Sequence, residues 1–214
     1  MLTVALAKGR IVDDLLPLWG SAGLPLPADL DDTRALVFEV PWPGFSPIRY
    51  LLAKPADVPT YVSFGVADIG VVGKDVLLEQ QKEMYELLDL DVSKCRLCVA
   101  GLPQDYDRRP ERVATKYPKL ADAYFRSQGQ SVEIVPLSGS IELASVIGLT
   151  DRIFDLVQTG STLVANGLTV FDTVYDISAR LVANRSSYRM KNREISEIVR
   201  RLDQAIAVRG DSRG

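Results

Sequence analysis

The sequence predicts an α/β protein of two units, and three observations lead to this fold class. Short apolar runs typical of buried strands alternate with helical patterns, as in LTVALA (2–7) followed by IVDDLLPLWGSAG (11–23). The same rhythm restarts from Lys94. A long extended segment, TVFDTVYDISARLVAN (169–184), then precedes an amphipathic C-terminal helix, REISEIVRRLDQAIAV (193–208). The alternation indicates mostly parallel sheets, and the restart indicates two α/β lobes with a cleft.

The elements of the first lobe follow from local signals. Apolar residues of 11–23 recur at helical spacing, and Pro17 should kink or shorten that helix. Pro59 is typical of the first turn of a helix, and another helix is expected from about Asp75. The expected strands are 2–7, 35–40, 48–53, 67–73 and 85–90.

The second lobe repeats the pattern. Its expected strands are 95–101, 112–116, 132–136 and 153–157, and its expected helices lie near 118–127 and from about Leu163. The two cysteines form a CxxC within the first of these strands, KCRLCVAG. Positions three apart in a strand point to opposite faces, so we interpret Cys95 and Cys98 as small apolar residues.

The composition excludes several classes of function. The chain has 214 residues, 47% hydrophobic and 25% charged, with a net charge of −3 and an isoelectric point near 5.1. This balance argues against a protein that coats nucleic acid or a membrane surface. No apolar run reaches the roughly 18 residues of a membrane span. The N-terminus MLTVALAKGR has its apolar residues before its charges, the reverse of a secretory signal. We therefore expect a cytoplasmic protein.

Histidine is absent from the sequence. Ser-His-Asp and Cys-His nucleophile systems and histidine-ligated zinc are therefore excluded. Catalysis has to use carboxylates, lysine, arginine, tyrosine, hydroxyls, backbone dipoles or a hard metal ion. This set favours chemistry that depends on charge stabilisation over proton transfer through imidazole.

The stretch DLVQTGSTLVANG (155–167) carries the clearest site signal. A strand containing Asp155 gives way to the polar turn TGST (159–162), which leads into a helix from about Leu163. A helix start presents unpaired N–H groups, and Gly160 lets the backbone approach an oxygen closely. The alternative is an N-cap, in which one Ser or Thr satisfies the helix end. A cap explains one hydroxyl of the three, so we favour a phosphate-binding turn.

Asp155 narrows the class of ligand. A carboxylate just before a phosphate-binding turn suits the vicinal hydroxyls of a ribose, which donate hydrogen bonds to it. The Walker A pattern GxxxxGK[ST] does not occur in the sequence, which excludes a P-loop nucleoside triphosphatase. The pattern therefore predicts a phosphorylated ribose.

The stretch ELASVIGLTDRIFDLVQTGSTLVANGL (142–168) resembles the signature of the ATP phosphoribosyltransferase family, whose reaction is the first step of histidine biosynthesis. Thr150 replaces a smaller residue, and Gln158 and Val164 replace charged residues often seen in the family; none of the three lies in the turn. The likeness extends to ALAKGR (5–10), DVPTYVSFGVADIGVVGKDVLLE (57–79), YELLDLDVSKCRL (85–97), RVATKYP (112–118) and ISARLVANRSS (177–187).

The resemblance implies a two-lobed fold like that of the type II periplasmic binding proteins, with the active site in the interlobe cleft. Lobe I would span 1–92 plus 175–214, and lobe II, carrying the phosphoribosyl pyrophosphate loop, 93–174. In the implied reaction, N1 of ATP attacks the anomeric carbon of phosphoribosyl pyrophosphate, and pyrophosphate leaves. A neutral ring nitrogen needs no strong base, whereas the developing charge calls for substrate-bound Mg²⁺ and fixed cations.

Candidate site residues come from position and from the resemblance. Lys8, Gly9 and Arg10 follow the first strand at its carboxyl end, where open α/β sheets bind ligands; the alternative is an ordinary turn. Lys54 stands where many relatives have arginine, and it keeps the charge without the bidentate fork. Arg34 and Arg49 are selected by their resemblance to family arginines, and the alternative is that each is a surface charge. For Asp68 the alternative is a structural cap. The expected sets are Asp155, Thr159, Gly160, Ser161, Thr162 and Leu163 for phosphoribosyl pyrophosphate, Arg10, Arg34 and Arg49 for catalysis, and Lys8, Gly9, Lys54, Asp68 and Gly73 for ATP or pyrophosphate.

The sequence ends soon after its amphipathic helix, with RGDSRG (209–214), and so resembles the short form of the family. The short form implies a homodimer and a hetero-oligomer with a regulatory subunit resembling a histidyl-tRNA synthetase, on which histidine sensing would lie.

Three other classes of protein are alternatives to this family. A transcription regulator with this fold would carry a helix-turn-helix before its lobes, whereas the first strand here begins at Leu2. An exported solute-binding protein would need a signal sequence. Phosphoribosyltransferases of the commoner fold usually have two adjacent acids before the Thr-Gly turn, whereas this sequence has only Asp155.

Overall fold

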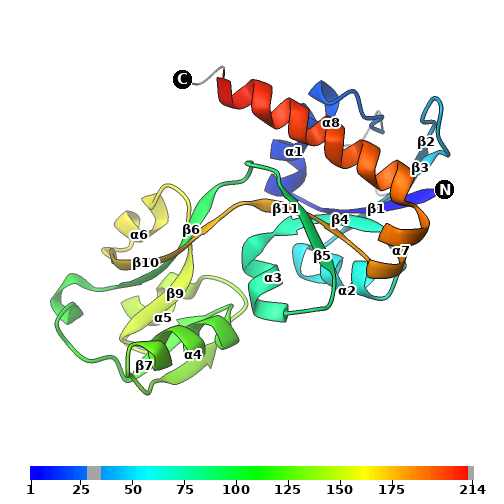
Figure 1. Ribbon diagram of the computed structural model, residues 1–214. Helices are drawn as coiled ribbons and strands as arrows, with labels where there is room; N and C mark the ends of the chain where they lie inside the picture. Colours follow the sequence, from blue (N-terminus) through cyan, green and yellow to red (C-terminus); the bar gives the residue numbers. More distant parts are fainter. Residues whose placement is uncertain (28–34, 212–214) are drawn as a thin grey trace. The chain divides into compact units, whose positions relative to one another are not determined.

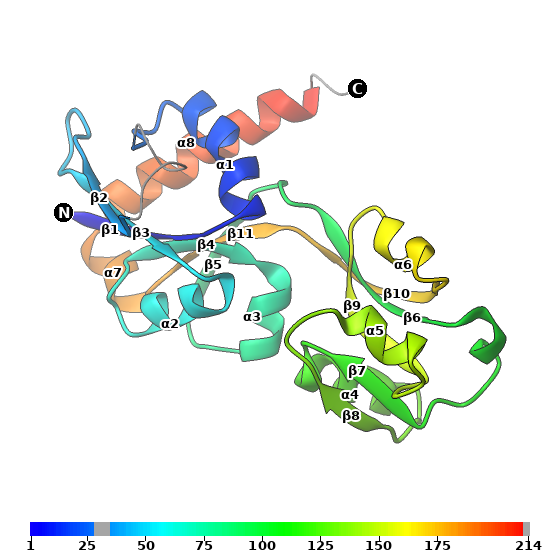
Figure 2. The ribbon, with the colours of Figure 1, turned by 180° about the vertical axis from the view of Figure 1, so that it is seen from behind.

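The computed structural model describes residues 1–27 and 35–211. The chain forms two compact units: unit 1 comprises Met1–Ser93 and Ser178–Gly214, and unit 2 comprises Lys94–Ile177. Each unit is built on its own β-sheet, and Figures 1 and 2 show both from opposite sides. Helices alternate with the strands in each unit, which confirms the predicted α/β class.

Unit 1 contains a sheet with the strand order β2-β3-β1-β4-β11-β5. Strands β3, β1 and β4 are parallel, whereas β2, β11 and β5 join antiparallel. The strands are β1 (Leu2–Ala7), β2 (Val37–Val40), β3 (Ile48–Ala53), β4 (Ile69–Gly73), β5 (Tyr85–Asp89) and β11 (Ala179–Ala183). The helices are α1 (Arg10–Ser21), α2 (Val58–Ser63), α3 (Lys74–Gln80), α7 (Arg185–Met190) and α8 (Asn192–Asp211).

Both faces of this sheet are covered, because its central strands are apolar on both sides. In β1, Val4 and Leu6 contribute to the core with residues of α1 and α8, whereas Ala5 and Ala7 contribute to the core with residues of α2. In Figure 1, α1 and α8 lie on one side of the sheet and α2 and α3 on the other. The run LTVALA is therefore a strand buried on both faces, as its continuous apolar character predicts.

Unit 2 contains a sheet with the strand order β10-β6-β9-β7-β8. Strands β9, β7 and β8 are parallel, whereas β6 runs antiparallel to both β9 and β10. The strands are β6 (Cys95–Gly101), β7 (Arg112–Thr115), β8 (Glu133–Pro136), β9 (Arg152–Val157) and β10 (Thr169–Ile177). The helices are α4 (Pro118–Ser127), α5 (Ile141–Val146) and α6 (Ser161–Ala165).

Both sheets are mixed, so the expectation of mostly parallel sheets is wrong. The extended segment 169–184 supplies β10 to one sheet and β11 to the other, and both strands pair antiparallel with their neighbours. The three parallel strands of each unit still end at a common edge, and such carboxyl edges bind ligands in open α/β sheets. The position of each candidate along its strand is therefore the first test of its role.

Candidate functional site

The turn TGST connects β9 to α6 in unit 2. Gly160 is the N-cap residue of α6 and has a left-handed backbone (φ 80°, ψ 0°), which favours glycine. A Cβ at this position would meet only the Val157 side chain, at 3.8 Å, so the backbone conformation rather than crowding selects glycine here. The turn is thus open at the point where a ligand would approach its backbone.

The hydroxyl groups of this turn are arranged around Gly160. The Oγ atoms of Thr159 and Ser161 lie 3.0 Å apart, and the Ser161 N–H donates to Thr159 Oγ1 at 3.3 Å. The first intrahelical bond after the turn runs from Val164 N to Gly160 O, at 3.0 Å. The N–H groups of residues 161–163 lie before that bond in the chain, and they have no acceptor within the helix. The Thr159 hydroxyl therefore accounts for one donor, that of Ser161, and Thr162 is exposed.

Asp155 lies on β9, two residues before the strand ends. It is 9% exposed and lies between Ile153 and Val157, which belong to the apolar core that α5 and α6 cover. Lys116, the residue after β7, places Nζ 3.9 Å from Asp155 Oδ2. The carboxylate thus lies on an otherwise apolar face, near the carboxyl edge and the turn.

In unit 1, the structure brings five of the predicted residues together at the carboxyl edge. Lys8 follows β1, and its N–H donates to Ala53 O at the end of β3, at 2.8 Å. The register of β1 with β3 and β4 places Lys8 beside Lys54 and Gly73. Gly9 is the N-cap residue of α1, and the exposed Arg10 begins that helix. Three cationic side chains therefore follow strand ends at one edge.

Gly73 ends β4 and is the N-cap residue of α3. A Cβ there would lie 2.1 Å from Oδ1 of Asp75, so a side chain cannot be accommodated without displacing this carboxylate. Asp75 is 6% exposed and lies in the first turn of α3, where a carboxylate is favoured. Asp75 was not among the residues expected at the site; its signal was an acid two residues after the glycine that ends a strand.

Asp68 lies at the opposite edge of the same sheet. It precedes β4, and its carboxylate accepts from Thr3 N, Ser187 Oγ and Lys191 Nζ, each at 2.7 Å. Thr3 and Lys8 are about 16 Å apart along β1, at ~3.3 Å per residue. The structure therefore does not bring Asp68 together with Lys8 and Gly73. Asp68 instead ties β1 and β4 to α7 and the start of α8.

Arg49 lies at that same amino edge. It is the second residue of β3 and pairs in register with Thr3 of β1. Its guanidinium binds Glu39 across the β2–β3 pair, with Nη2 2.7 Å and Nε 3.0 Å from Glu39 Oε1. The structure thus separates Arg49 from Arg10, with which it was expected to act in catalysis. Arg34 lies outside the described residues.

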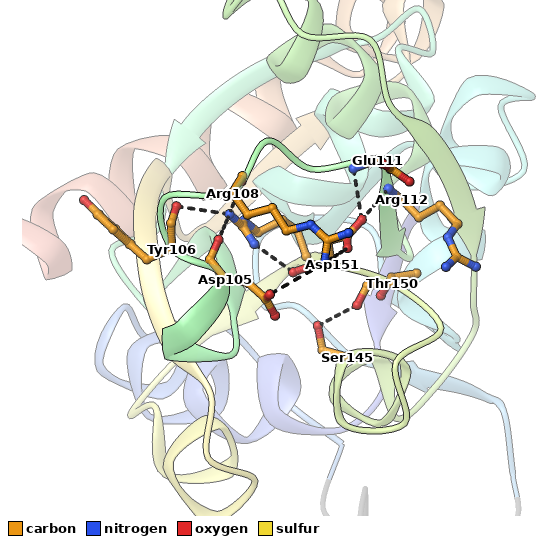
Figure 3. A network of polar contacts seen from close by, with 9 residues as sticks. Asp105, Tyr106, Arg108, Glu111, Arg112, Ser145, Thr150 and Asp151 are labelled. Atoms are coloured by element: carbon orange, nitrogen blue, oxygen red, sulfur yellow. Dashed lines mark hydrogen bonds and ion pairs between the residues drawn. The ribbon is translucent and has the colours of Figure 1, made fainter.

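A polar network at the amino end of β9 anchors the loop between β6 and β7 (Figure 3). Asp151 Oδ2 accepts from Glu111 N at 2.9 Å and from Arg112 N at 3.0 Å. Burial favours a raised pKa for Asp151, but these donors and Arg108 outweigh it and hold the pKa below its ordinary value. A cavity of about 440 Å³ adjoins the loop, α4 and β10. Its buried Arg152 donates to backbone carbonyls of the loop, so we interpret this region as structural.

Among residues 1–27 and 35–211, no group of three or more Asp, Glu, Cys or His side chains could hold a metal ion. Within the same ranges, no helix combines the length and the apolar character needed to cross a membrane.

The fold defines the class of protein. The chain resembles the periplasmic aliphatic sulphonate binding protein SsuA from Escherichia coli, with a TM-score of 0.63 and 14% identity over 99% of this chain and 74% of that chain. This likeness concerns the fold alone. A chain of the ATP phosphoribosyl transferase (HisG:HisZ) complex from Thermotoga maritima is similar with a TM-score of 0.79 and 32% identity, over 97% of this chain and 99% of that chain. The protein thus has the α/β fold of the type II periplasmic binding proteins, as predicted.

The sequence relatives define the family. The profile of the HisG family, ATP phosphoribosyltransferase, matches residues 54–204. The ATP phosphoribosyltransferase of Geobacillus sp. (strain WCH70) is 51% identical, over 96% of this chain and 99% of the relative. That of Bacillus subtilis (strain 168) is 49% identical, over 99% and 98%. The chain belongs to the ATP phosphoribosyltransferase family, transferases of the pentosyltransferase type that act in the first step of histidine biosynthesis.

Proposed function

We propose that this chain transfers the 5-phosphoribosyl group of phosphoribosyl pyrophosphate to N1 of ATP and releases pyrophosphate. The observation that carries the proposal is the arrangement in unit 2, where Asp155 precedes an open turn centred on the left-handed Gly160. A simple helix cap requires neither the glycine backbone nor a buried carboxylate two residues from the strand end.

Unit 2 would bind the phosphorylated ribose. Asp155 offers acceptors to the vicinal ribose hydroxyls. The backbone N–H groups of Thr162 and Leu163 and the hydroxyls of the turn offer donors to the 5-phosphate, at a position where Gly160 leaves the backbone accessible. In the transfer, the N1 lone pair forms the bond to the anomeric carbon, and the bond from that carbon to the pyrophosphate oxygen breaks with its electron pair.

Unit 1 would bind anionic groups at its carboxyl edge. Lys8, Arg10 and Lys54 supply fixed positive charge, which stabilises the negative charge that develops on the departing pyrophosphate. Gly9 keeps the backbone accessible beside these cations, whereas Gly73 makes room for the Asp75 carboxylate. Arg34 stays in the proposed set on its resemblance to a family arginine. Asp68 and Arg49 are left out, because their carboxylate and guanidinium bind other residues at the amino edge.

Mg²⁺ would enter with the substrates, because it is usually bound through substrate phosphates and a small number of carboxylates rather than by a protein cage. When bound, it neutralises charge on the leaving pyrophosphate. Phosphate oxygens of the substrate, rather than side chains of this chain, supply most of its ligands in this proposal. We place the reaction in the cytoplasm, where amino-acid biosynthesis takes place.

The direct test combines the chain with ATP, phosphoribosyl pyrophosphate and Mg²⁺ and follows the ultraviolet absorbance of the N1-ribosylated adenine. Gly160→Val should raise the KM for phosphoribosyl pyrophosphate far more than that for ATP, because a β-branched side chain displaces the backbone from the 5-phosphate. Gly129→Val is the matched control, since Gly129 also has positive φ in an open turn of unit 2. Equal kinetics in the two variants would contradict the assignment of the turn.

We further propose that the chain forms a homodimer and assembles with a regulatory subunit resembling a histidyl-tRNA synthetase. The support is the likeness, over nearly the whole of both chains, to a chain of the Thermotoga maritima HisG:HisZ complex. Histidine sensing would then lie on the second polypeptide, and coupling would cross their interface. The purified chain alone should bind both substrates, show weak activity and ignore histidine. Full histidine sensitivity without a second polypeptide would overturn this assignment.

A further inference from the structure

Lys116 follows the end of β7, at the carboxyl edge of the sheet in unit 2. Strands β7 and β9 are parallel, and Thr115 pairs in register with Phe154. The next residue on each strand is therefore Lys116 on one side and Asp155 on the other. The ammonium is thus placed beside the carboxylate that precedes the turn TGST.

The backbone at Lys116 is held on both sides. Thr115 is fully buried, and its Oγ1 donates to Phe154 O at 2.6 Å and accepts from Tyr117 N at 2.8 Å. Tyr117 is also buried, and Pro118 begins α4 directly afterwards. Since its neighbours are anchored, Lys116 keeps a fixed Cα, and its 41% exposed side chain retains freedom to move.

The contact between Lys116 and Asp155 leaves the ammonium able to serve another anion. At 3.9 Å, Nζ and Oδ2 are farther apart than in a hydrogen bond, which spans about 2.7–3.2 Å. The ammonium carries three donors. By contrast, Lys191 approaches Asp68 to 2.7 Å and donates to Met1 O at 2.8 Å. The two lysine–aspartate pairs therefore differ: Lys191 lies within hydrogen-bond distance of its aspartate, whereas Lys116 does not.

The turn needs a cation that its own residues do not provide. The segment QTGSTLVAN (158–166) contains hydroxyls and amides but no basic residue. A phosphorylated ribose brings several negative charges close to the Asp155 carboxylate, and like charges repel. We propose that Lys116 is a substrate-binding cation of unit 2, which pairs with Asp155 in the free protein and with the anionic groups of phosphoribosyl pyrophosphate in the complex. This inference rests on the proposed function.

The experiment compares Lys116→Met, which removes the charge and keeps a long side chain, with Arg126→Met. Arg126 is an exposed cation at the other end of α4, paired with Asp122, so its loss makes the same charge change in the same unit. Isothermal titration calorimetry gives the Kd for phosphoribosyl pyrophosphate, for ribose 5-phosphate and for ATP. Lys116→Met should weaken phosphoribosyl pyrophosphate about 10-fold or more, and Lys116→Arg should restore most of the affinity. The Kd for ATP and the Tm should stay at wild-type values.

The outcomes separate this inference from the proposed function. A Lys116→Met protein that binds phosphoribosyl pyrophosphate as tightly as Arg126→Met would overturn the role of Lys116, whatever the activity. An equal loss for ATP and phosphoribosyl pyrophosphate would overturn it too, because it indicates a general disturbance. A wild-type chain that binds phosphoribosyl pyrophosphate but forms no phosphoribosyl-ATP would count against the proposed function. The comparison of Kd values between Lys116→Met and Arg126→Met would still decide the role of Lys116.

Discussion

Asp68 and Asp155 are both nearly buried aspartates, each beside a lysine, and they lie in different units. Asp68 is 4% exposed at the amino edge of its sheet, and three donors at 2.7 Å occupy its carboxylate. Asp155 is 9% exposed near the carboxyl edge of its sheet, and its lysine stays 3.9 Å away. Burial and charge alone therefore do not separate the two aspartates. They differ in the end of the strand at which they lie and in the distance to the neighbouring lysine, and on these two differences we propose that Asp155 binds ligand and that Asp68 is structural.

The largest expected effect is on the activity of Asp155→Asn. The amide keeps the shape but removes the charge and one acceptor position for the ribose hydroxyls. We expect kcat/KM for phosphoribosyl pyrophosphate to fall roughly 10²-fold, the scale of one or two hydrogen bonds to a charged group, with an unchanged Tm. Asp176→Asn, an exposed site on β10, is the control and should behave as wild type. Loss of folding with intact activity per folded molecule would make Asp155 a structural acid.

Asp68→Ala should show the reverse pattern. The substitution leaves the Lys191 ammonium, Ser187 Oγ and Thr3 N–H without their common acceptor. Breaking a buried pair costs about 3–5 kcal/mol, but the Lys191 side chain is 33% exposed, so we expect about 2–3 kcal/mol in the free energy of unfolding.

Urea unfolding measures this change, and Asp203→Ala on the exposed side of α8 is its control. The KM values of the folded Asp68→Ala protein should equal those of the wild type. If the variant stays as stable as the control and its KM for ATP rises, Asp68 belongs to the ATP site after all.

The fold was predictable where local chemistry decides it. Helix α4 has the expected bounds, 118–127, because Pro118 suits the first helical position. Other bounds differ by a few residues. Helix α1 contains Pro17 and ends at Ser21, and α6 begins at Ser161, two residues before the expected Leu163, with Gly160 as its N-cap residue. The direction of each strand could not be predicted from the sequence, because side chains alternate between the two faces with a period of two in parallel and antiparallel strands alike.

The candidate site was predictable only in part, because a role depends on where a residue lies along its strand. Lys8 and Lys54 directly follow apolar runs, and the structure places them side by side at a carboxyl edge. Arg49 stands near the beginning of the run IRYLLA, a sign of the amino edge that charge alone did not reveal. Lys116 was overlooked although it directly follows a buried strand, the same signal that selects Lys8.

The smallest expected effect belongs to Arg49→Ala. Its guanidinium binds Glu39 on the neighbouring strand, and both side chains are more than a third exposed. Such exposed pairs contribute about 0–1 kcal/mol, so a double-mutant cycle with Glu39→Ala should give a coupling free energy below about 1 kcal/mol. We expect kcat/KM to change less than about twofold, since five strand positions separate the level of Arg49 from that of Lys54. The family resemblance suggests a catalytic arginine here, so the measurement decides between the two hypotheses. A fall in kcat of about 10²-fold at unchanged stability, the scale of a lost transition-state donor, would return Arg49 to the catalytic set and show that strand position alone does not locate this site.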